Sequence, residues 1–494
     1  MKAVLQRLDY LTQSTRGLLL MVTGWEALIV ALLGMISAPM QELLRLSIIL
    51  PEAERVGRIV MVYHSLAIPF VAAITYLVLD MVPTTEESAR TIRRLITPGY
   101  MLVGIGSLTF AYLGRNWLFH GLLLFGQSLV FYAGVLLAVG LWPWRHRNAD
   151  PTYAHLGSLS LERVAFFVVT VAMLVSVLIG AGAGAFFGNG FEAVLAEDIV
   201  REEHNLGELA VISHLHIMLA LIDVAILLLV VRKFDLKGRL HQIAMPLTIA
   251  GTAVMAAGCW SVMLWEEIAH WIIYAGSSLV LLAALLMTIA GMGRLIRNQL
   301  AEQQIAHSTL GQKVKALLRN PLQFGLFFQM IWLQSVMVFP GLYTAVKLDE
   351  IFRTWPLEAE RRILVGHWHI LATASAVMML LLVADRLGVR GWMRQVLGWG
   401  ILVGANLAFT VAVFYEFLPP EANRDWTILY LDISIGLALI VLALFLGWRL
   451  VDLFLAQGHW TEERGQDDNG NTIHHSQHGA CHPIGPRYPG YPDR

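Results

Sequence analysis

Twelve long apolar stretches dominate this sequence, and each is close to the length of a membrane-spanning helix. A bilayer core about 30 Å thick is crossed by about 20 helical residues. Lipid cannot satisfy an open strand edge, and barrel strands would be half as long with strict alternation, so helices are predicted. The approximate limits are 17–38, 59–80, 98–114, 117–141, 164–187, 209–231, 242–265, 270–292, 322–345, 364–385, 396–418 and 427–450. The expected fold class is therefore an all-α integral membrane protein with 12 transmembrane helices.

The composition agrees with residence in a membrane. Of the 494 residues, 57% are hydrophobic and only 14% are charged, which is too few solvating side chains for a soluble protein of this size. Lys and Arg (35) balance Asp and Glu (36), so no basic surplus points to nucleic acid. The two cysteines cannot build a disulfide framework, and the absence of a Cys-x-x-Cys-His motif excludes a covalently attached c-type haem.

The distribution of Lys and Arg predicts the orientation of the helices, because cytoplasmic loops carry most of these residues. With the N-terminus inside, the inner segments hold 25 of the 35 Lys and Arg. Both termini are therefore predicted to be cytoplasmic, in a multi-pass protein of a bacterial-type inner membrane. The polar, Pro-rich segment 456–494 is expected to be a disordered cytoplasmic tail.

Rare polar residues recur with a period near 153 residues. His216 lies 152 residues after His64, and His369 lies 153 residues after His216. His270 lies 150 residues after His120, in the fourth and eighth spans. Apolar helices resemble one another by composition alone, but these matched residues are rare inside lipid, so they indicate an internal repeat.

A short charged motif supports the same period. The string Glu-Ala-Glu-Arg occurs at 52–55 and again at 358–361, which is twice 153 residues later. We therefore expect three pseudo-repeated units of four helices each within a membrane domain of residues 1–455. The units are residues 17–141, 164–292 and 322–450.

Five histidines lie at one depth, within the first turns of helices predicted to enter the membrane from outside. An ionisable residue inside a membrane is costly and is a functional candidate by default. Side chains at positions i and i+2 of a helix point about 200° apart, so a His-x-His pair can reach a separate group on each side. The five are His64 in the second span, His214 and His216 in the sixth, and His367 and His369 in the tenth.

The surroundings of these histidines favour haem over other metal groups. Imidazole ligates zinc, copper and haem iron alike. Zinc sites usually include Cys or carboxylate ligands close in sequence, whereas Leu, Ile, Ala, Ser and Met surround these histidines and are typical of a porphyrin pocket between helices. The alternative is that the histidines only form hydrogen bonds across the bundle, for example to Ser65 and Ser213.

Four other polar residues at membrane depth are weaker candidates. His120 and His270 begin the fourth and eighth spans, where they could serve a quinone, a haem propionate or a partner subunit, or reach the headgroups beside neighbouring tryptophans. Glu26 and Asp223 lie within spans, and Asp223 is seven residues after His216 and hence on nearly the same face. These two carboxyl groups could relay protons or stay buried and neutral.

The whole pattern resembles subunit I of the haem-copper oxidase superfamily, which includes the nitric oxide reductases. The likeness covers residues 17–450 and consists of twelve spans with threefold internal similarity and histidines early in spans two, six and ten. In that family the span-two histidine and the second histidine of the span-ten pair ligate a low-spin haem, and the first of the pair ligates a high-spin haem. The resemblance therefore implies that His64 and His369 hold one haem and that His367 holds another.

One part of the family pattern is missing. The family builds a copper or non-haem iron site from one span-six histidine and an adjacent histidine pair in span seven, but residues 242–265 contain no such pair. We therefore expect no copper site. His214 or His216 could instead coordinate the open face of the second haem.

The resemblance implies a membrane electron-transfer subunit with two or more haem b groups. It would pass electrons between a quinol or an outer-face c-type cytochrome and a partner, as a subunit of a larger respiratory complex. One alternative is an active oxygen or nitric oxide reductase with an unusual metal site. Another is a transporter with a histidine-lined site, although transporter repeats are more often inverted or two-fold.

Overall fold

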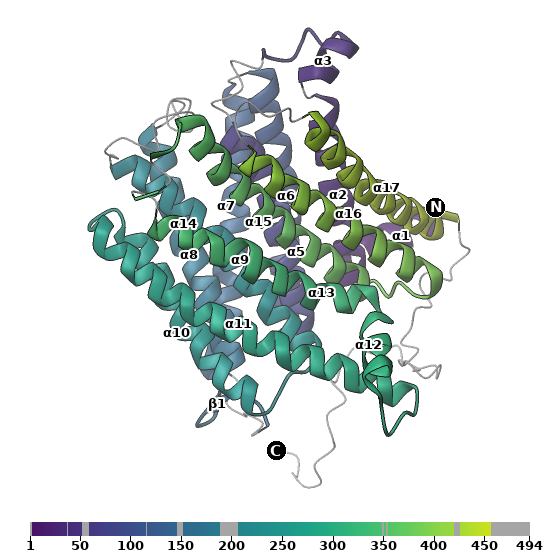
Figure 1. Cartoon of the computed structure of the whole chain (residues 1–494). Helices are drawn as coiled ribbons and strands as arrows, with labels where there is room; N and C mark the ends of the chain where they lie inside the picture. Colours follow the sequence, from purple (N-terminus) through teal and green to yellow (C-terminus); the bar gives the residue numbers. More distant parts are fainter. Residues whose placement is uncertain are drawn as a thin grey trace. The chain divides into compact units, whose positions relative to one another are not determined.

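The computed structural model describes residues 2–36, 38–51, 59–114, 116–145, 152–187, 206–347, 350–351, 354–418 and 425–455. In this part of the chain almost every residue is α-helical (Figure 1), and 11 helices are long and apolar enough to cross a membrane. The prediction of an all-α, multi-pass membrane protein is confirmed. The predicted tail 456–494 and the first Glu-Ala-Glu-Arg string, 52–55, lie outside the described residues.

The chain divides into two compact units, Met1–Phe445 and Leu446–Arg494, and the arrangement given below is that of the first. Its N-terminal elements are α1 (Lys2–Gln13), α2 (Thr15–Met35), α3 (Ala38–Leu44), α5 (Ile59–Met81), α6 (Glu86–Leu113), α7 (Trp117–Gly140) and the short η2 (Pro143–Arg145). The middle elements are the antiparallel pair β1 (His155–Leu156) and β2 (Leu159–Ser160), then α8 (Leu161–Phe187), α9 (Leu206–Lys233), α10 (Arg239–Ser261) and α11 (Glu266–Glu302). The last elements are α12 (Leu310–Leu318), α13 (Pro321–Trp332), α14 (Phe339–Val346), α15 (Leu357–Arg386), α16 (Gly391–Phe417) and α17 (Asp425–Leu455), of which α17 continues into the second unit.

The ninth predicted span, 322–345, differs most from expectation. It consists of α13 and α14 joined by a turn of π-helix at Leu333–Val338, so no single helix reaches spanning length. Pro340 stands in the first turn of α14 and has no backbone N–H to continue the α-helical hydrogen bonds of the preceding turn. The widened turn upstream of this proline explains why 11 long helices are found among the described residues instead of 12.

Three helix crossings are so close that only a residue without a side chain fits. At each crossing, a Cβ atom on a glycine would lie about 3 Å from a carbonyl oxygen of the facing helix. Small residues let transmembrane helices approach to backbone contact. The pairs are Gly99 in α6 with Gly126 in α7 (3.2 Å), Gly251 in α10 with Gly276 in α11 (2.9 Å), and Gly404 in α16 with Ser434 in α17 (2.8 Å).

The centre of the first unit is formed by α5, α9 and α15, the second, sixth and tenth predicted spans (Figure 1). The apolar windows of α5 and α9 are 61% buried and that of α15 is 56% buried, against 28% for α2, α7 and α8. These three helices are therefore shielded from lipid. Buried polar side chains on them, such as Ser65, Ser213 and Ser375, face protein, which lowers the cost of carrying them at membrane depth, whereas the side chains of His216 and His369 are exposed.

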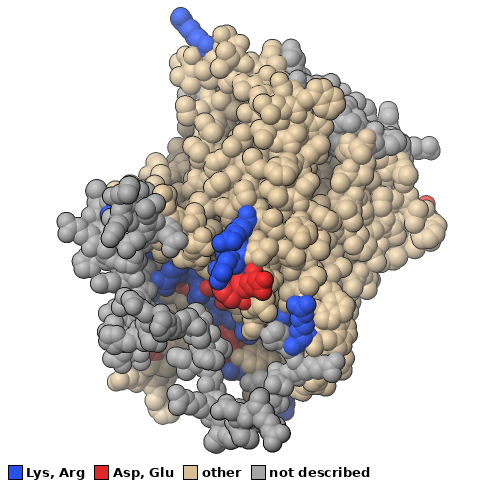
Figure 2. Space-filling view, turned by 180° about the vertical axis from the view of Figure 1, so that it is seen from behind, with Lys and Arg blue, Asp and Glu red and all other residues tan. Residues whose placement is uncertain are grey.

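Polar contacts join the C-terminal ends of these three helices around an open cavity of about 290 Å³. Figure 2 shows charged side chains gathered in the lower part of one face, below a broad area that has almost none. Such a division is typical of a surface that is apolar where lipid covers it and charged where water begins. The contacts are Arg386 with Asp80, Lys233 with Asp385, and the Arg232 Nε donating to the Met81 carbonyl oxygen at 2.9 Å.

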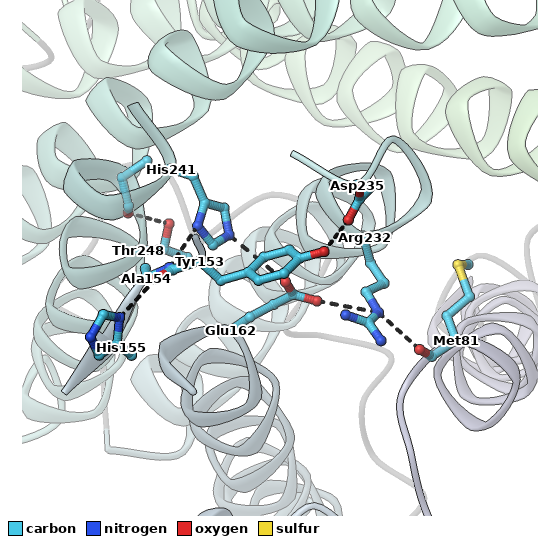
Figure 3. Close-up of polar contacts among 10 residues, drawn as sticks. Met81, Tyr153, Ala154, His155, Glu162, Arg232, Asp235, His241 and Thr248 are labelled. Carbon is cyan, nitrogen blue, oxygen red and sulfur yellow. Dashed lines mark hydrogen bonds and ion pairs between the residues drawn. The ribbon is translucent and has the colours of Figure 1, made fainter. Parts of the chain in front are cut away.

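A polar cluster at the same end fastens the β1–β2 hairpin to the helices (Figure 3). The buried Glu162 carboxylate lies 3.6 Å from the Arg232 guanidinium and 3.7 Å from the His241 imidazole. The backbone N–H of Ala154 donates to His241 Nδ1 at 3.0 Å, and the Tyr153 hydroxyl donates to the Asp235 carboxylate. The residues that lead into the hairpin are thus tied to the turn after α9 and to α10.

The hairpin contact gives a prediction about pH. Partial burial acts to raise the pKa of Asp235, but hydrogen bonds from Tyr153 and Lys237 outweigh it and hold the pKa below its usual range. A carboxyl group whose pKa is lower in the folded state stabilises the protein above its unfolded pKa of about 3.9, and this contribution is lost as pH falls through the folded value. Because Asp235 is half-exposed, we expect its ionised carboxylate to contribute less than about 1 kcal/mol to the free energy of unfolding.

The measurement compares the melting temperatures of the wild type and Asp235→Asn in detergent. The wild type should melt higher at pH 7, and the gap should close toward pH 3 because protonated Asp and Asn then have similar charge. A gap of equal size at both pH values would contradict the lowered pKa.

Candidate functional site

The imidazoles of His64 and His214 form a close pair between α5 and α9. Their ring centres lie 6.3 Å apart, and the ring planes differ by only 14°. The two residues come from helices separated by about 150 residues of sequence, and both lie near the N-terminal ends of those helices. Two of the five predicted histidines are therefore brought together by the packing of the central helices.

Hydrogen bonds fix which ring nitrogen of each histidine carries its proton. Nδ1 of His64 lies 2.8 Å from the Val60 carbonyl oxygen, and Nδ1 of His214 lies 2.8 Å from the Ser176 carbonyl oxygen on α8. A carbonyl oxygen only accepts, so Nδ1 is the donor in both rings. Nε2 is then the unprotonated nitrogen of a neutral ring, which is the nitrogen that binds a metal ion.

A glycine on α8 makes room for the His214 ring. A Cβ atom at Gly180 would lie 2.6 Å from His214 Nδ1 and 2.7 Å from its Cε1, so any side chain there would displace the imidazole. The carbonyl oxygen that accepts the hydrogen bond from His214 Nδ1 belongs to Ser176. The Ser176 hydroxyl in turn accepts a hydrogen bond from the Trp260 indole at 3.1 Å. The ring is therefore held by α8, which the Trp260 contact in turn joins to α10.

His216 and His367, which lie between α9 and α15, do not form a parallel pair like that of His64 and His214. His216 Nδ1 bonds the Ile212 carbonyl oxygen of its own helix at 2.9 Å. His367 is near enough to His216 for an electrostatic interaction, and its ring lies against Gly341 of α14. A Cβ atom at Gly341 would be 2.5 Å from His367 Cε1 and 2.7 Å from Nε2, so the Nε2 edge of this ring faces the α14 backbone.

Tyr63 completes the arrangement between α15 and α5. Its hydroxyl lies 3.0 Å from His369 Nε2, and the two ring centres are 6.2 Å apart. The structure thus places His64 with His214 and His369 with Tyr63, where the resemblance implies a shared ligand for His64 and His369. Sequence reasoning missed Tyr63, although it lies 306 residues before His369, which is twice the repeat period.

The serines that were alternative partners for the histidines bond elsewhere. The Ser65 hydroxyl donates to the Val62 carbonyl oxygen at 2.6 Å, and the Ser213 hydroxyl donates to the Cys259 carbonyl oxygen at 2.7 Å. A hydroxyl has one proton to give. These bonds use the protons of both serines on backbone oxygens, and that of Ser213 also ties α9 to α10.

The two interfacial histidines each stack on an aromatic ring. His120 stacks on Trp117, with ring centres 6.3 Å apart and planes 19° apart. His270 stacks on Tyr274 at 6.3 Å and 21°. Both contacts are within the first turns of α7 and α11, where an amphipathic ring beside an aromatic residue suits the edge of the membrane.

The two carboxyl groups within spans have separate surroundings. Asp223 on α9 accepts a hydrogen bond of 2.5 Å from the Ser375 hydroxyl on α15, midway along the central helices. Glu26 lies on α2, within electrostatic range of Tyr100 on α6. Asp223 therefore shares the α9–α15 interface with His216 and His367, while Glu26 belongs to a different helix pair.

In the described part of the chain, no group of three or more His, Cys, Asp or Glu side chains is placed to hold a metal ion. Structural zinc sites take four protein ligands and catalytic ones usually three, whereas haem iron needs at most two axial ligands from the protein. The paired histidines of the described residues are therefore fewer than the ligands that a protein-bound zinc ion usually has.

Comparison with known proteins gives no relative from which to take a function. No protein-family model matches the chain, and no curated protein or solved structure is detectably similar to it. The function has to be inferred from the chain's own residues.

Proposed function

We propose that this protein is a membrane electron-transfer subunit that binds haem b through histidines of α5, α9 and α15. The observation that carries the proposal is the His64–His214 pair, with near-parallel rings whose centres are 6.3 Å apart. Two imidazoles on opposite sides of one metal ion, each bound at about 2 Å, have ring centres roughly 6 Å apart. The separation of 6.3 Å is therefore the one expected for a pair that shares one iron with both Nε2 atoms directed at it.

The surroundings of His64 and His214 also suit a haem group. Each Nδ1 donates to a backbone carbonyl, which fixes the ring orientation and makes Nε2 a stronger ligand. Gly180 leaves space on α8 for the His214 ring, and most of the other side chains of α8 are apolar. Haem bound there would supply one-electron transfer, and the protein would supply ligands, orientation and a dry environment.

The proposed architecture has twelve spans in three repeated units of four helices. Two features support it beyond the spacing of the histidines. The glycines of the three close crossings, Gly99, Gly251 and Gly404, are spaced by 152 and 153 residues, and each faces a carbonyl oxygen of the next span. The helical segment from Pro321 to Val346 is long enough to serve as the ninth span despite its π-helical turn.

The proposed location is a bacterial-type inner membrane with both termini in the cytoplasm. The histidines then lie near the outer surface, because α5, α9 and α15 enter from that side. A quinol or an outer-face c-type cytochrome would exchange electrons with the haem from there, within a larger respiratory complex. A second haem would depend on His216 and His367, and the His367 ring would first have to turn its Nε2 away from Gly341 of α14.

An absorption spectrum of the purified full-length chain tests the proposal. We expect a Soret band, a b-type spectrum on reduction with dithionite, and at least one haem b per chain. Six-coordinate iron has no vacancy for a gas, so carbon monoxide should change the reduced spectrum little. A preparation without a Soret band, from cells supplied with haem, would refute the proposal, and strong carbon monoxide binding with stoichiometric copper or non-haem iron would replace it with an active reductase.

A further inference from the structure

We infer that His64 and His214 are the axial pair of one haem iron and that Tyr63 holds His369 in a position from which it does not ligate that iron. This inference rests on the proposed haem function. It departs from the pairing of His64 with His369 that the resemblance implies, and it adds Tyr63 as a positioning residue.

The first step concerns the directions of adjacent side chains on α5. Successive residues of a helix point about 100° apart, so neighbours serve different interfaces. Tyr63 reaches His369 on α15, and the His64 ring lies beside the nearly parallel ring of His214 on α9. The same turn of α5 therefore sends one side chain to each of its two central neighbours. His64 is directed to α9 and not to α15.

The second step concerns the nitrogen that a metal would need. His369 Nε2 and the Tyr63 hydroxyl are 3.0 Å apart. In one tautomer His369 Nε2 accepts a hydrogen bond from the Tyr63 hydroxyl, which occupies its lone pair. In the other tautomer Nε2 carries the proton and has no lone pair for a metal. In both cases the Tyr63 contact must break before His369 Nε2 can bind iron.

The third step concerns the direction of His214. The ring atoms closest to a Cβ position at Gly180 are Nδ1, Cε1 and Cγ, so Nε2 lies on the side of the ring away from α8. His64 contributes a ring nearly parallel to it, with its own Nδ1 bonded to the Val60 carbonyl oxygen. Both Nε2 atoms are thus left as the nitrogens for a ligand shared between α5 and α9.

The His367 ring differs from the His214 ring in which of its nitrogens faces the preceding helix. Its Nε2 would be 2.7 Å from a Cβ position at Gly341, so the nitrogen a metal needs faces the backbone of α14. His214 has its Nδ1 edge against the glycine of the preceding helix, and His367 has its Nε2 edge there. The geometry therefore selects His214, and not His367, as the partner of His64.

The experiment uses the full-length protein with single substitutions of His64, His214 and His369 to Ala. The readouts are haem per chain and the low-spin signal in absorption and electron paramagnetic resonance spectra, with gel filtration as a check of folding. Loss of a group that only orients a ligand typically weakens metal-group binding by about 10- to 100-fold. Loss of the ligand itself should cost at least as much, so His64→Ala and His214→Ala should each lose most of the low-spin signal. His369→Ala and Tyr63→Phe should keep it.

Substitution by Met gives a second measurement. Unlike Ala, Met fills most of the space of the histidine side chain, so the result does not depend on whether the protein still folds around an empty cavity. Met is a haem ligand that raises the midpoint potential relative to His. His214→Met should therefore retain low-spin haem at a higher potential, and His369→Met should leave the potential unchanged. Loss of the signal in His369→Ala, or a raised potential in His369→Met with no change in His214→Met, would overturn the assignment. A wild-type chain without any haem would refute the proposed function itself, which is a different result.

Discussion

A single methyl group added at Gly276 should destabilise the protein strongly. In Gly276→Ala the new Cβ atom would lie 2.3 Å from the backbone nitrogen of Met255 and 2.7 Å from its Cα. A side chain could rotate out of the way, but backbone atoms cannot, so α10 and α11 must move apart along their crossing. Overpacking of a well-packed core typically costs about 1–3 kcal/mol, and we expect the upper end here because the clash is with backbone.

Gly121→Ala on α7 is the matched control. No atom lies within 4 Å of a Cβ position at Gly121, so the same chemical change meets open space. Ala is favoured over Gly in a helix by about 1 kcal/mol, so this variant should be as stable as the wild type or more stable. The measurement is the apparent melting temperature in detergent, and equal melting temperatures for the two variants would contradict the close crossing.

The sequence predicted where lipid covers the helices better than where the helices end. The third predicted span, 98–114, lies within α6, which begins at Glu86, and the eighth, 270–292, lies within α11, which ends at Glu302. Hydropathy reports the apolar part of a helix, and a helix continues into water as long as its residues favour it. The additional turns of α6 contain three arginines, which hydropathy counts against a span but which suit a helix in water.

The break in the ninth span had a signal in the sequence that hydropathy averaging does not use. Residues 322–345 contain no charged residue and are mostly apolar, so a window of about 19 residues gives a continuous span. The π-helical turn at Leu333–Val338 depends on the pattern of backbone hydrogen bonds, and Pro340 is the only local sign of it. Proline alone does not predict such a turn, because Pro69, Pro98 and Pro246 lie inside α5, α6 and α10 without interrupting these helices.

The position of the histidine cluster was predictable, but its pairing was not. Rare ionisable residues at a repeated spacing placed His64, His216 and His369 at one depth on three equivalent helices, with His214 two residues before His216. Helical periodicity gives the direction of a side chain on its own helix, but it does not say which neighbouring helix it faces. That choice depends on packing, which is why the structure brings His64 to His214 and leaves His369 with Tyr63.

Glycines were the other part of the site that sequence patterns could not identify. Gly180 and Gly182 stand two residues apart in a run of small residues, and composition does not distinguish them. A Cβ atom at Gly180 would meet the His214 ring at 2.6 Å, and one at Gly182 would meet nothing within 4 Å. Only the packing of α8 against α9 reveals which of the two is required.

This difference gives the most direct test of the proposed haem pocket on a residue that is not itself a proposed ligand. In Gly180→Ala the added methyl group must push the His214 ring away from α8 and break its 2.8 Å hydrogen bond to the Ser176 carbonyl. Loss of the group that orients a ligand typically weakens metal-group binding by about 10- to 100-fold. We therefore expect the full-length Gly180→Ala protein to lose most of the low-spin haem of the wild type.

Gly182→Ala is the control, because it adds the same methyl group two residues away and in open space. It should retain the haem content and the absorption spectrum of the wild type. Haem per chain and the reduced absorption spectrum are measured for both variants after equal haem supply during expression. If Gly180→Ala and Gly182→Ala have the same haem content, the His214 ring does not need the space at Gly180, and His214 is not the ligand that α8 positions.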